Sequence, residues 1–247
     1  MRIAVAGGTG VVGSHVVEAV RANGHDAVVL SRGSGVDLIT GSGLDAALAG
    51  VDAVVDTANV STLKADAAVR FFETATGNLI TAAERAGVRH VVLLSIVGVD
   101  RMPYDYYAGK IAQERVVEAS PVPWTILRAT QFHEFAAQLF AQAKVGPLHV
   151  APRARVQPVA AREVGARLAA LAAGPAQGRA ADFAGPREER LDDMVKAYAR
   201  HIGHGGWIPS VSLPGPQMKG MRSGLALPGP GALLGTQTFT ESLAALG

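Results

Sequence analysis

The chain of 247 residues has no cysteine, few aromatic residues and a formal net charge of only +2. Without cysteine it has neither a disulfide framework nor thiolate chemistry, so we expect a protein of the reducing cytoplasm. No apolar run approaches the roughly 18 residues of a membrane helix, and the apolar run at the start is too short for a signal peptide. We therefore expect a soluble protein that does not bind membranes. The basic residues are scattered, and no basic stripe indicates a nucleic-acid partner.

A length of 247 residues is enough to bury a sizeable core. It is compatible with one large α/β domain, and we predict a single domain over residues 1–247. The composition contains no indication of the oligomeric state.

The most informative stretch is the first, in which a short apolar run breaks into glycines and then resumes with helical spacing. Residues 3–6 are apolar and partly β-branched, as in a buried strand, and residues 14–22 can form a helix. Between them lie glycines three residues apart, a spacing that lets a backbone turn, approach a pyrophosphate and pack a helix against the strand. A glycine-rich turn without a ligand is the alternative. The candidate cofactor contacts are Gly7, Thr9, Gly10, Val11, Val12 and Gly13.

The second predicted strand, residues 27–30, is followed by an arginine between two serines. A carboxylate at this position of a dinucleotide-binding fold binds the ribose hydroxyls of NAD, whereas an arginine suits the 2′-phosphate of NADP. Arg32, with Ser31 and Ser34, therefore favours NADP(H) over NAD(H), although it can also be a surface arginine in a flexible loop. Residues 36–38 resemble a short third strand, where Asp37 can hydrogen-bond an adenine amino group or simply begin a turn.

Strand and helix patterns then continue to alternate. We predict a helix over 44–48, a strand over 53–56, an amphipathic helix over 64–86 and a strand over 90–95. No hairpin signal interrupts them, so the pattern predicts an α/β doubly wound parallel sheet. Because ligands lie beyond the carboxyl edge of such a sheet, the loop Thr57-Ala58-Asn59 is also predicted to face the cofactor.

A second constellation follows the strand over 90–95. Tyr106 and Lys110 are four residues apart, so in a helix they project from one face. A phenol can protonate the oxygen of a carbonyl that receives a hydride, and an ammonium nearby lowers the phenol pKa and can hold the nicotinamide ribose. Ser95, at the strand end, can hydrogen-bond the same oxygen. Tyr104 and Tyr107 compete with Tyr106 for this role, and a tyrosine on a helix is more often a packing residue.

These motifs together resemble the short-chain dehydrogenase/reductase superfamily, in its atypical NmrA-like branch of NAD(P)-binding proteins. The resemblance rests on the glycine loop, on the Tyr106 and Lys110 pair after Ser95, and on the segment 122–128 followed by Phe132. That segment is similar to the family's ILRP strand, with Ala129 in place of the proline. The motifs run from the N-terminus to about residue 135.

The resemblance implies a Rossmann fold with a small C-terminal substrate lobe, mainly within residues 130–247. It implies that Gly7, Gly10 and Gly13 bind the pyrophosphate, Arg32 the 2′-phosphate and Lys110 the ribose. The branch also contains members that bind the nucleotide without turning it over, as redox sensors.

In the C-terminal half, the segment after the ILRP-like strand is the candidate substrate site. Phe132 and Phe135 would form an apolar wall and His133 a proton route or polar contact, whereas Glu134 fits better in the first turn of a helix. We predict helices over 162–173 and 191–201 and a short capped helix after Thr238.

Two further groups of residues, a histidine pair and a methionine-rich face, have structural roles as one possible interpretation. His201 and His204 fit a helix C-terminus better than a metal site, and no metal is predicted. Met218, Met221 and Leu225 form an apolar face that either covers the substrate site or packs on the lobe.

The leading hypothesis is an NADP-dependent oxidoreductase that reduces a carbonyl or related acceptor on a small molecule. Two alternatives stay open: an NADPH-dependent quinone or azo reductase, and a regulatory protein that senses NADP(H) without consuming it.

Overall fold

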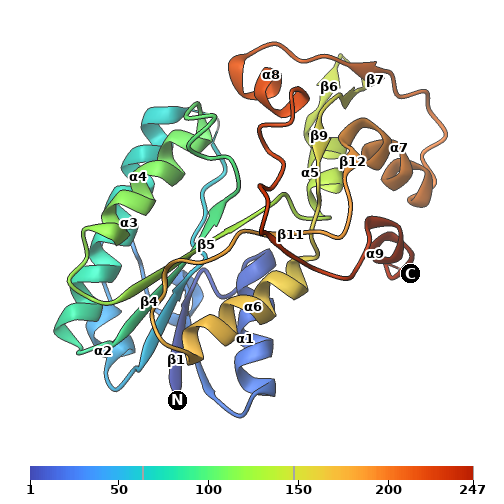
Figure 1. The fold of residues 1–247 in the computed structure, drawn as a ribbon. Coiled ribbons are helices and arrows are strands. Elements are labelled where there is room, and N and C mark those ends of the chain that lie inside the picture. Colours follow the sequence, from blue (N-terminus) through green and yellow to red (C-terminus); the bar gives the residue numbers. More distant parts are fainter. Residues whose placement is uncertain (63, 147, 247) are drawn as a thin grey trace.

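The structure, a computed structural model, describes residues 1–62, 64–146 and 148–246. Its centre is a sheet of eight parallel strands in the spatial order β14-β11-β5-β4-β3-β1-β2, with β10 also paired to β5 (Figure 1). The strands are β1 (Arg2–Ala6), β2 (Asp26–Leu30), β3 (Ala53–Asp56), β4 (His90–Ile96), β5 (Trp124–Ala129), β10 (Gly178–Arg179), β11 (Phe183–Ala184) and β14 (Leu233–Leu234). The predicted doubly wound parallel sheet is confirmed.

The strand order reverses at β1. The chain runs outward from β1 to β2, then returns to the other side of β1 for β3 and continues outward through β4 and β5. In a sheet of this kind, ligands bind beyond the carboxyl ends of the strands at the point of reversal. The glycine loop follows β1, and residues 57–59 follow β3, so both lie at this point.

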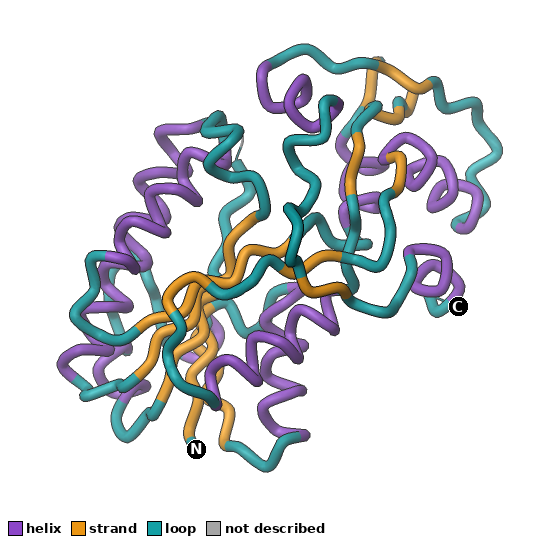
Figure 2. The backbone as a smooth tube through the Cα atoms, viewed as in Figure 1, coloured by secondary structure: helices purple, strands orange, loops and turns teal. Residues whose placement is uncertain are grey.

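Helices cover both faces of the sheet, as Figures 1 and 2 show. One face carries α1 (Val11–Ala22) and α6 (Ala161–Ala173), and the other carries α2 (Leu44–Leu48), α3 (Ala65–Arg85) and α4 (Tyr106–Glu118). Because side chains alternate along a strand, Ile3 and Val5 pack towards the first pair, and Ala4 and Ala6 towards the other three. The helices predicted from apolar spacing are therefore confirmed to within three residues at their ends.

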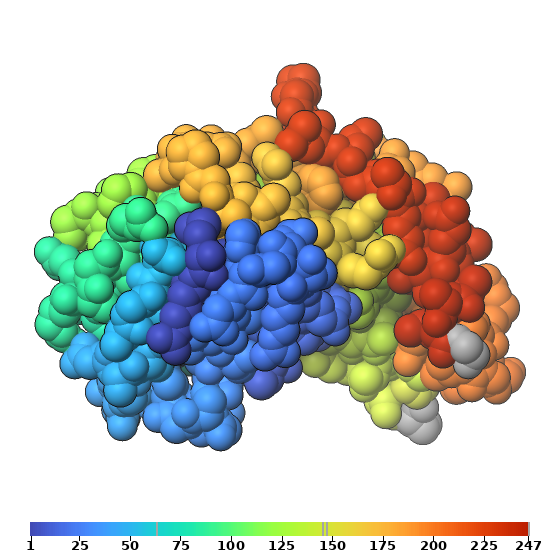
Figure 3. Space-filling model, turned by 90° about the horizontal axis from the view of Figure 1, so that it is seen from below, coloured from blue at the N-terminus to red at the C-terminus, as the bar shows by residue number. Residues whose placement is uncertain are grey.

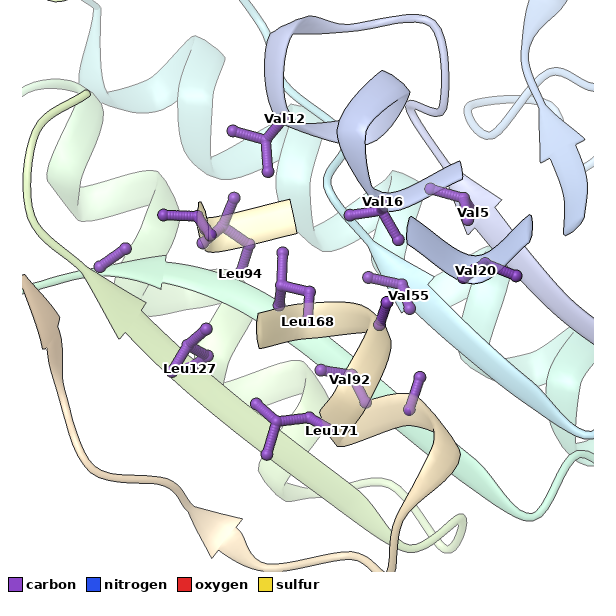
Figure 4. Packing of buried hydrophobic residues seen from close by; sticks show 14 of the residues in the cluster. Val5, Val12, Val16, Val20, Val55, Val92, Leu94, Leu127, Leu168 and Leu171 are labelled. Atoms are coloured by element: carbon purple, nitrogen blue, oxygen red, sulfur yellow. The ribbon is translucent and has the colours of Figure 1, made fainter. Parts of the chain in front are cut away.

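The face under α1 and α6 is packed with branched side chains. Val12, Val16 and Val20 of α1 and Leu168 and Leu171 of α6 lie over strand residues that include Val5, Val55, Val92 and Leu127 (Figure 4). Gly165 brings the two helices together, since a Cβ there would lie 2.6 Å from the Cβ of His15. Figure 3 shows α6, in yellow, beside α1, in blue. The close helix pair places the start of α6 near the carboxyl edge of the sheet.

The segments after β5 build a lobe beyond that edge. Its helices are α5 (Phe135–Gln142), α7 (Leu191–His201), α8 (Pro216–Arg222) and α9 (Phe239–Ala244). Short strand pairs join them: β6 (Lys144–Val145) with β7 (Leu148–His149), β8 (Ala151–Pro152) with β13 (Ser210–Val211), and β9 (Arg155–Val156) with β12 (Glu189–Arg190). The predicted cap of the last helix is confirmed, because Thr238 and Glu241 form a reciprocal capping box.

The lobe has its own apolar core, called here the lobe cluster. Its buried members are Val99, Met102, Tyr107, Ala136, Ala154, Val156, Leu191, Met194, Met221, Ala226 and Phe239. Met218 and Leu225 pack against it, so the methionine-rich face of α8 lies on the lobe. That a substrate also lies under this face stays a prediction.

The strand predicted over residues 36–38 is wrong. These residues form a loop and a turn, in which one carboxylate oxygen of Asp37 accepts the backbone N–H groups of Ile39 and Thr40. A side chain that binds nearby backbone in this way competes with strand pairing. Val36 is nevertheless buried, which accounts for the apolar signal.

Within the described ranges, every helix is too short or too polar to cross a bilayer. The same residues contain no group of three or more His, Cys, Asp or Glu side chains placed to hold a metal ion.

Candidate functional site

The glycine loop leaves no room for side chains. Gly7 has a φ of 71°, a conformation that favours glycine, and a Cβ there would lie 2.8 Å from the carbonyl oxygen of Thr57. A Cβ on Gly13 would lie 2.1 Å from the carbonyl oxygen of Gly7. The turn after β1, the loop after β3 and the first turn of α1 are therefore in direct contact.

The N-terminus of α1 is free for an anion. Gly10 is its N-cap residue and provides no side-chain hydrogen bond, and the first turn contains no acidic residue. Its unpaired N–H groups and the positive end of the helix dipole attract phosphate. Val11 is exposed, and Val12 is buried against the sheet. Backbone and dipole thus fit the pyrophosphate of a dinucleotide, and no side chain of this turn competes for the position.

Beside this loop, β2 ends in a single turn of 3-10 helix, Arg32–Ser34. Ser31 and Ser34 cap it reciprocally, and the Ser34 hydroxyl donates to the carbonyl oxygen of Val29 at 2.8 Å. The two serines are therefore used to shape the turn. The Arg32 side chain is exposed and forms no ion pair or hydrogen bond with the part of the chain that the structure describes.

The loop after β3 connects the glycine loop to α4. Thr57 donates its hydroxyl proton to the carbonyl oxygen of Ala6 at 2.7 Å, and the Ala58 N–H donates to the Asp56 carboxylate at 2.9 Å. Asn59 is exposed, and its side-chain oxygen accepts the Tyr106 hydroxyl at 2.7 Å. The phenol is therefore held at the carboxyl edge of the sheet. Its partner Asn59 follows Thr57, the residue that contacts the glycine loop, by two positions.

Tyr106 and Lys110 share one face of α4, as predicted. Both contact Phe72 of α3: the Tyr106 ring lies edge-on with centroids 5.7 Å apart, and the Lys110 Nζ lies 4.8 Å from the Phe72 centroid. Burial, together with the neighbouring Tyr107, raises the pKa of Tyr106. The phenol thus keeps its proton across the physiological range, while the raised pKa makes it a weaker acid than a free tyrosine.

Lys110, however, is directed into the protein. It is 5% exposed, and its ammonium donates to the carbonyl oxygen of Leu94 at 2.7 Å and to the side-chain oxygen of Gln113. Burial lowers its pKa to about 8, although the negative charges of Asp56 and Glu114 act in the opposite direction. The structure does not bring this ammonium to a surface that a ribose could contact, and its predicted binding of ribose stays a prediction.

Ser95 is also buried, at 2% exposed. Its hydroxyl donates to the carboxylate of Glu114 on α4, which also accepts bonds from Arg128 and Arg179. The structure therefore brings Ser95 into an ion-pair network and not beside the Tyr106 hydroxyl. Its predicted bond to a substrate oxygen is untested.

The other two tyrosines near α4 differ sharply in environment. Tyr104 is 43% exposed, whereas Tyr107 is 6% exposed within the lobe cluster, its ring centroid 6.3 Å from that of Tyr106. Asp105, the N-cap of α4, has a φ of 49°, the one positive φ outside glycine in the described residues. Such strained conformations are common at functional sites.

The candidate substrate residues spread over two environments. Phe132 packs on the cluster under α1 and α6, and Phe135 packs on the lobe cluster. His133 is 4% exposed, its Nε2 lies 3.2 Å from the carbonyl oxygen of Pro158, and burial lowers its pKa. Glu134 is exposed at the N-cap of α5. His133 therefore joins the β5 loop to the segment before α6, and a proton route through it remains a prediction.

The structure also identifies polar residues that sequence reasoning missed. Asn59 was predicted as a cofactor contact, but its bond to Tyr106 was not. Gln131 and Gln217 flank Tyr107, and Glu114 is the buried centre of an ion-pair network that reaches the surface. Glutamine and glutamate are common on surfaces, so no sequence signal distinguished these positions.

Comparisons with known proteins agree with the fold. A family model described as NAD(P)H-binding matches residues 7–165. A search of the curated proteins finds no match to this sequence.

Solved structures with the same fold come from several bacteria. A quinone oxidoreductase from Escherichia coli complexed with NADPH has a TM-score of 0.73 and 20% identity, covering 99% of each chain. A short-chain dehydrogenase/reductase protein from Agrobacterium tumefaciens with bound NAD has a TM-score of 0.69 and 19% identity, covering 99% of this chain and 95% of that one. A UDP-N-acetylglucosamine 4-epimerase from Bacillus cereus has a TM-score of 0.70 and 16% identity, covering 100% and 96%. At these identities the likeness extends to the fold and no further.

Proposed function

We propose that this chain, which belongs to a family of NAD(P)H-binding proteins, is an NADP-dependent oxidoreductase of the short-chain dehydrogenase/reductase type. It reduces a carbonyl or related acceptor on a small organic molecule. The observation that carries this proposal is the Tyr106 hydroxyl, held by Asn59 between the cofactor edge of the sheet and the lobe.

In this proposal the backbone of the glycine loop and α1 holds the pyrophosphate, and residues 57–59 line the path towards the nicotinamide. NADPH supplies the hydride. Tyr106 gives its proton to the acceptor oxygen, which becomes a much stronger base as the hydride arrives at the carbonyl carbon. Lys110 and Ser95 support Tyr106 indirectly, because both fasten α4 to β4.

A quinone-type acceptor is the second candidate. The observation that favours it is the burial of Lys110: without an ammonium beside the phenol, an acceptor that needs little acid catalysis is the easier substrate. The third hypothesis, a silent NADP(H) sensor, shares the same cofactor site and differs only in turnover.

The choice of NADP rests on Arg32. Its exposed guanidinium, without a partner in the described residues, is free to form charge-assisted bonds with a 2′-phosphate. We expect Arg32→Ala to weaken NADPH binding about 10- to 100-fold and to leave NADH binding almost unchanged, since such bonds contribute about 1.5–3 kcal/mol. Calorimetric titration of both nucleotides measures the two affinities.

Arg21→Ala is the matched control, because Arg21 is also exposed but lies in the last turn of α1. It should bind both nucleotides like the wild type. Equal wild-type affinity for NADPH and NADH, unchanged in Arg32→Ala, would contradict the NADP assignment.

A further inference from the structure

Two clusters of polar side chains lie against α4, one buried and one half-buried, and they differ in how completely their hydrogen bonds are formed. The first joins Lys110, Gln113, Thr76 and Asp56. The Gln113 amide donates to Asp56 at 3.0 Å and to Thr76 at 2.9 Å, and Thr76 donates to Asp56 at 2.8 Å. Lys110 completes it through Gln113 and the Leu94 carbonyl. A network with every member paired is a structural element of the fold.

The second cluster consists of Tyr107, Gln131 and Gln217, and it is incomplete. The Gln131 amide lies 3.4 Å from the Tyr107 hydroxyl, which is long for a hydrogen bond. The Gln131 side-chain oxygen is buried and has no partner in the described residues. If the amide group is rotated by 180°, its nitrogen takes the place of the unpaired oxygen and is unpaired instead. One polar atom of this side chain therefore lacks a partner in either orientation. Buried polar atoms are normally paired, and an unpaired one indicates a place for a further group.

The three side chains converge from separate parts of the chain: Tyr107 from α4, Gln131 from the loop after β5, and Gln217 from α8. Burial raises the pKa of the Tyr107 phenol, and hydrogen bonding by Gln131 and Gln217 acts in the opposite direction. The ring of Tyr107 is also the neighbour of Tyr106. The cluster therefore lies next to the phenol that is proposed to protonate the substrate.

The surroundings restrict what that molecule can be. The lobe cluster around Tyr107 is apolar, and Met102 and Met221 are among its members. Methionine side chains adapt their shape to a ligand. Gln131, Gln217 and Tyr107 can both donate and accept hydrogen bonds but carry no charge. The recognition chemistry is that of an uncharged, largely apolar molecule with a second carbonyl or hydroxyl group away from the reacting carbonyl.

We infer that Tyr107, Gln131 and Gln217 bind the distal oxygen of an uncharged, largely apolar substrate whose reacting oxygen lies at Tyr106. This inference rests on the proposed function, because it assumes that the acceptor is reduced beside Tyr106. α8 covers the cluster and carries Gln217 between Gly215 and Gly224, which have φ angles of 101° and 86°.

The test uses 1,4-naphthoquinone, which is uncharged and has two opposed carbonyl oxygens, as the probe. Its binding to the full chain is measured by calorimetry, separately from NADPH binding and NADPH oxidation. Gln131→Leu should weaken probe binding about 5- to 30-fold, the loss expected for one buried hydrogen bond. Its NADPH affinity should not change. Gln138→Leu is the matched control, because Gln138 is exposed on α5.

Tyr107→Phe is the second variant, and it should weaken the probe similarly while thermal unfolding shows that both variants are folded. Probe binding that is absent in the wild type, or equal in the wild type and both variants, overturns the inference. Probe binding that depends on Gln131 without any NADPH oxidation supports the binding site and overturns the proposed reductase.

Discussion

Replacing Tyr106 with phenylalanine should lower kcat about 10²- to 10⁴-fold, the range expected for the loss of a general acid. The measurement is steady-state NADPH oxidation with the carbonyl acceptor that the wild type reduces fastest. The variant loses the proton donor and the bond to Asn59 but keeps the ring contact with Phe72. NADPH affinity should therefore stay near the wild-type value.

The control for this experiment is Tyr104→Phe, because Tyr104 lies two residues away and is 43% exposed. We expect it to retain full activity. If Tyr106→Phe turns over at the wild-type rate with unchanged NADPH binding, the proton comes from another group, with Tyr107 and His133 the next candidates.

Glu114→Ala should lower the free energy of unfolding by about 3–5 kcal/mol, the loss expected when one partner of a buried ion pair is removed. The Glu114 side chain is 3% exposed and accepts bonds from Arg128 at 2.8 and 2.9 Å, from Arg179 at 3.0 Å and from Ser95. Burial acts to raise the pKa of Glu114, but the bonds and charges of the arginines and the Ser95 bond outweigh it and hold the pKa below its usual value. Removing the carboxylate leaves the Arg128 guanidinium, itself 17% exposed, without its main partner.

Urea unfolding at neutral pH measures this loss. Glu118→Ala is the matched control: Glu118 also pairs with Arg179, at 2.6 Å, but is 34% exposed, so its loss should stay below about 1 kcal/mol. A change for Glu114→Ala no larger than for Glu118→Ala would show that the network does not fasten α4 to the sheet.

The fold could be predicted from sequence because buried parallel strands and amphipathic helices each leave a regular pattern. The strands over 53–56 and 90–96 are mostly apolar, and the glycines after β1 lie where backbone contacts allow no Cβ. The exception, residues 36–38, had an apolar pattern but also Asp37, whose side chain binds nearby backbone N–H groups.

The direction of individual polar side chains could not be predicted in the same way. Helical spacing correctly placed Tyr106 and Lys110 on one face, but the position of the lysine ammonium depends on Gln113 and on the Leu94 carbonyl across the helix–sheet interface. Because β4 is buried on both faces, its periodicity did not indicate which way Ser95 points. Whether the side-chain oxygen of Gln131 finds a hydrogen-bond partner depends on three separate parts of the chain, which only the fold brings together.

The most direct test of the central claim is NADPH consumption by the wild-type protein across a panel of carbonyl and quinone acceptors, followed at the nicotinamide absorbance. The proposal predicts steady oxidation that depends on both acceptor and enzyme concentration. NADPH binding that stabilises the protein against heat, without consumption in the presence of any acceptor, would contradict the enzyme assignment and favour a nucleotide sensor.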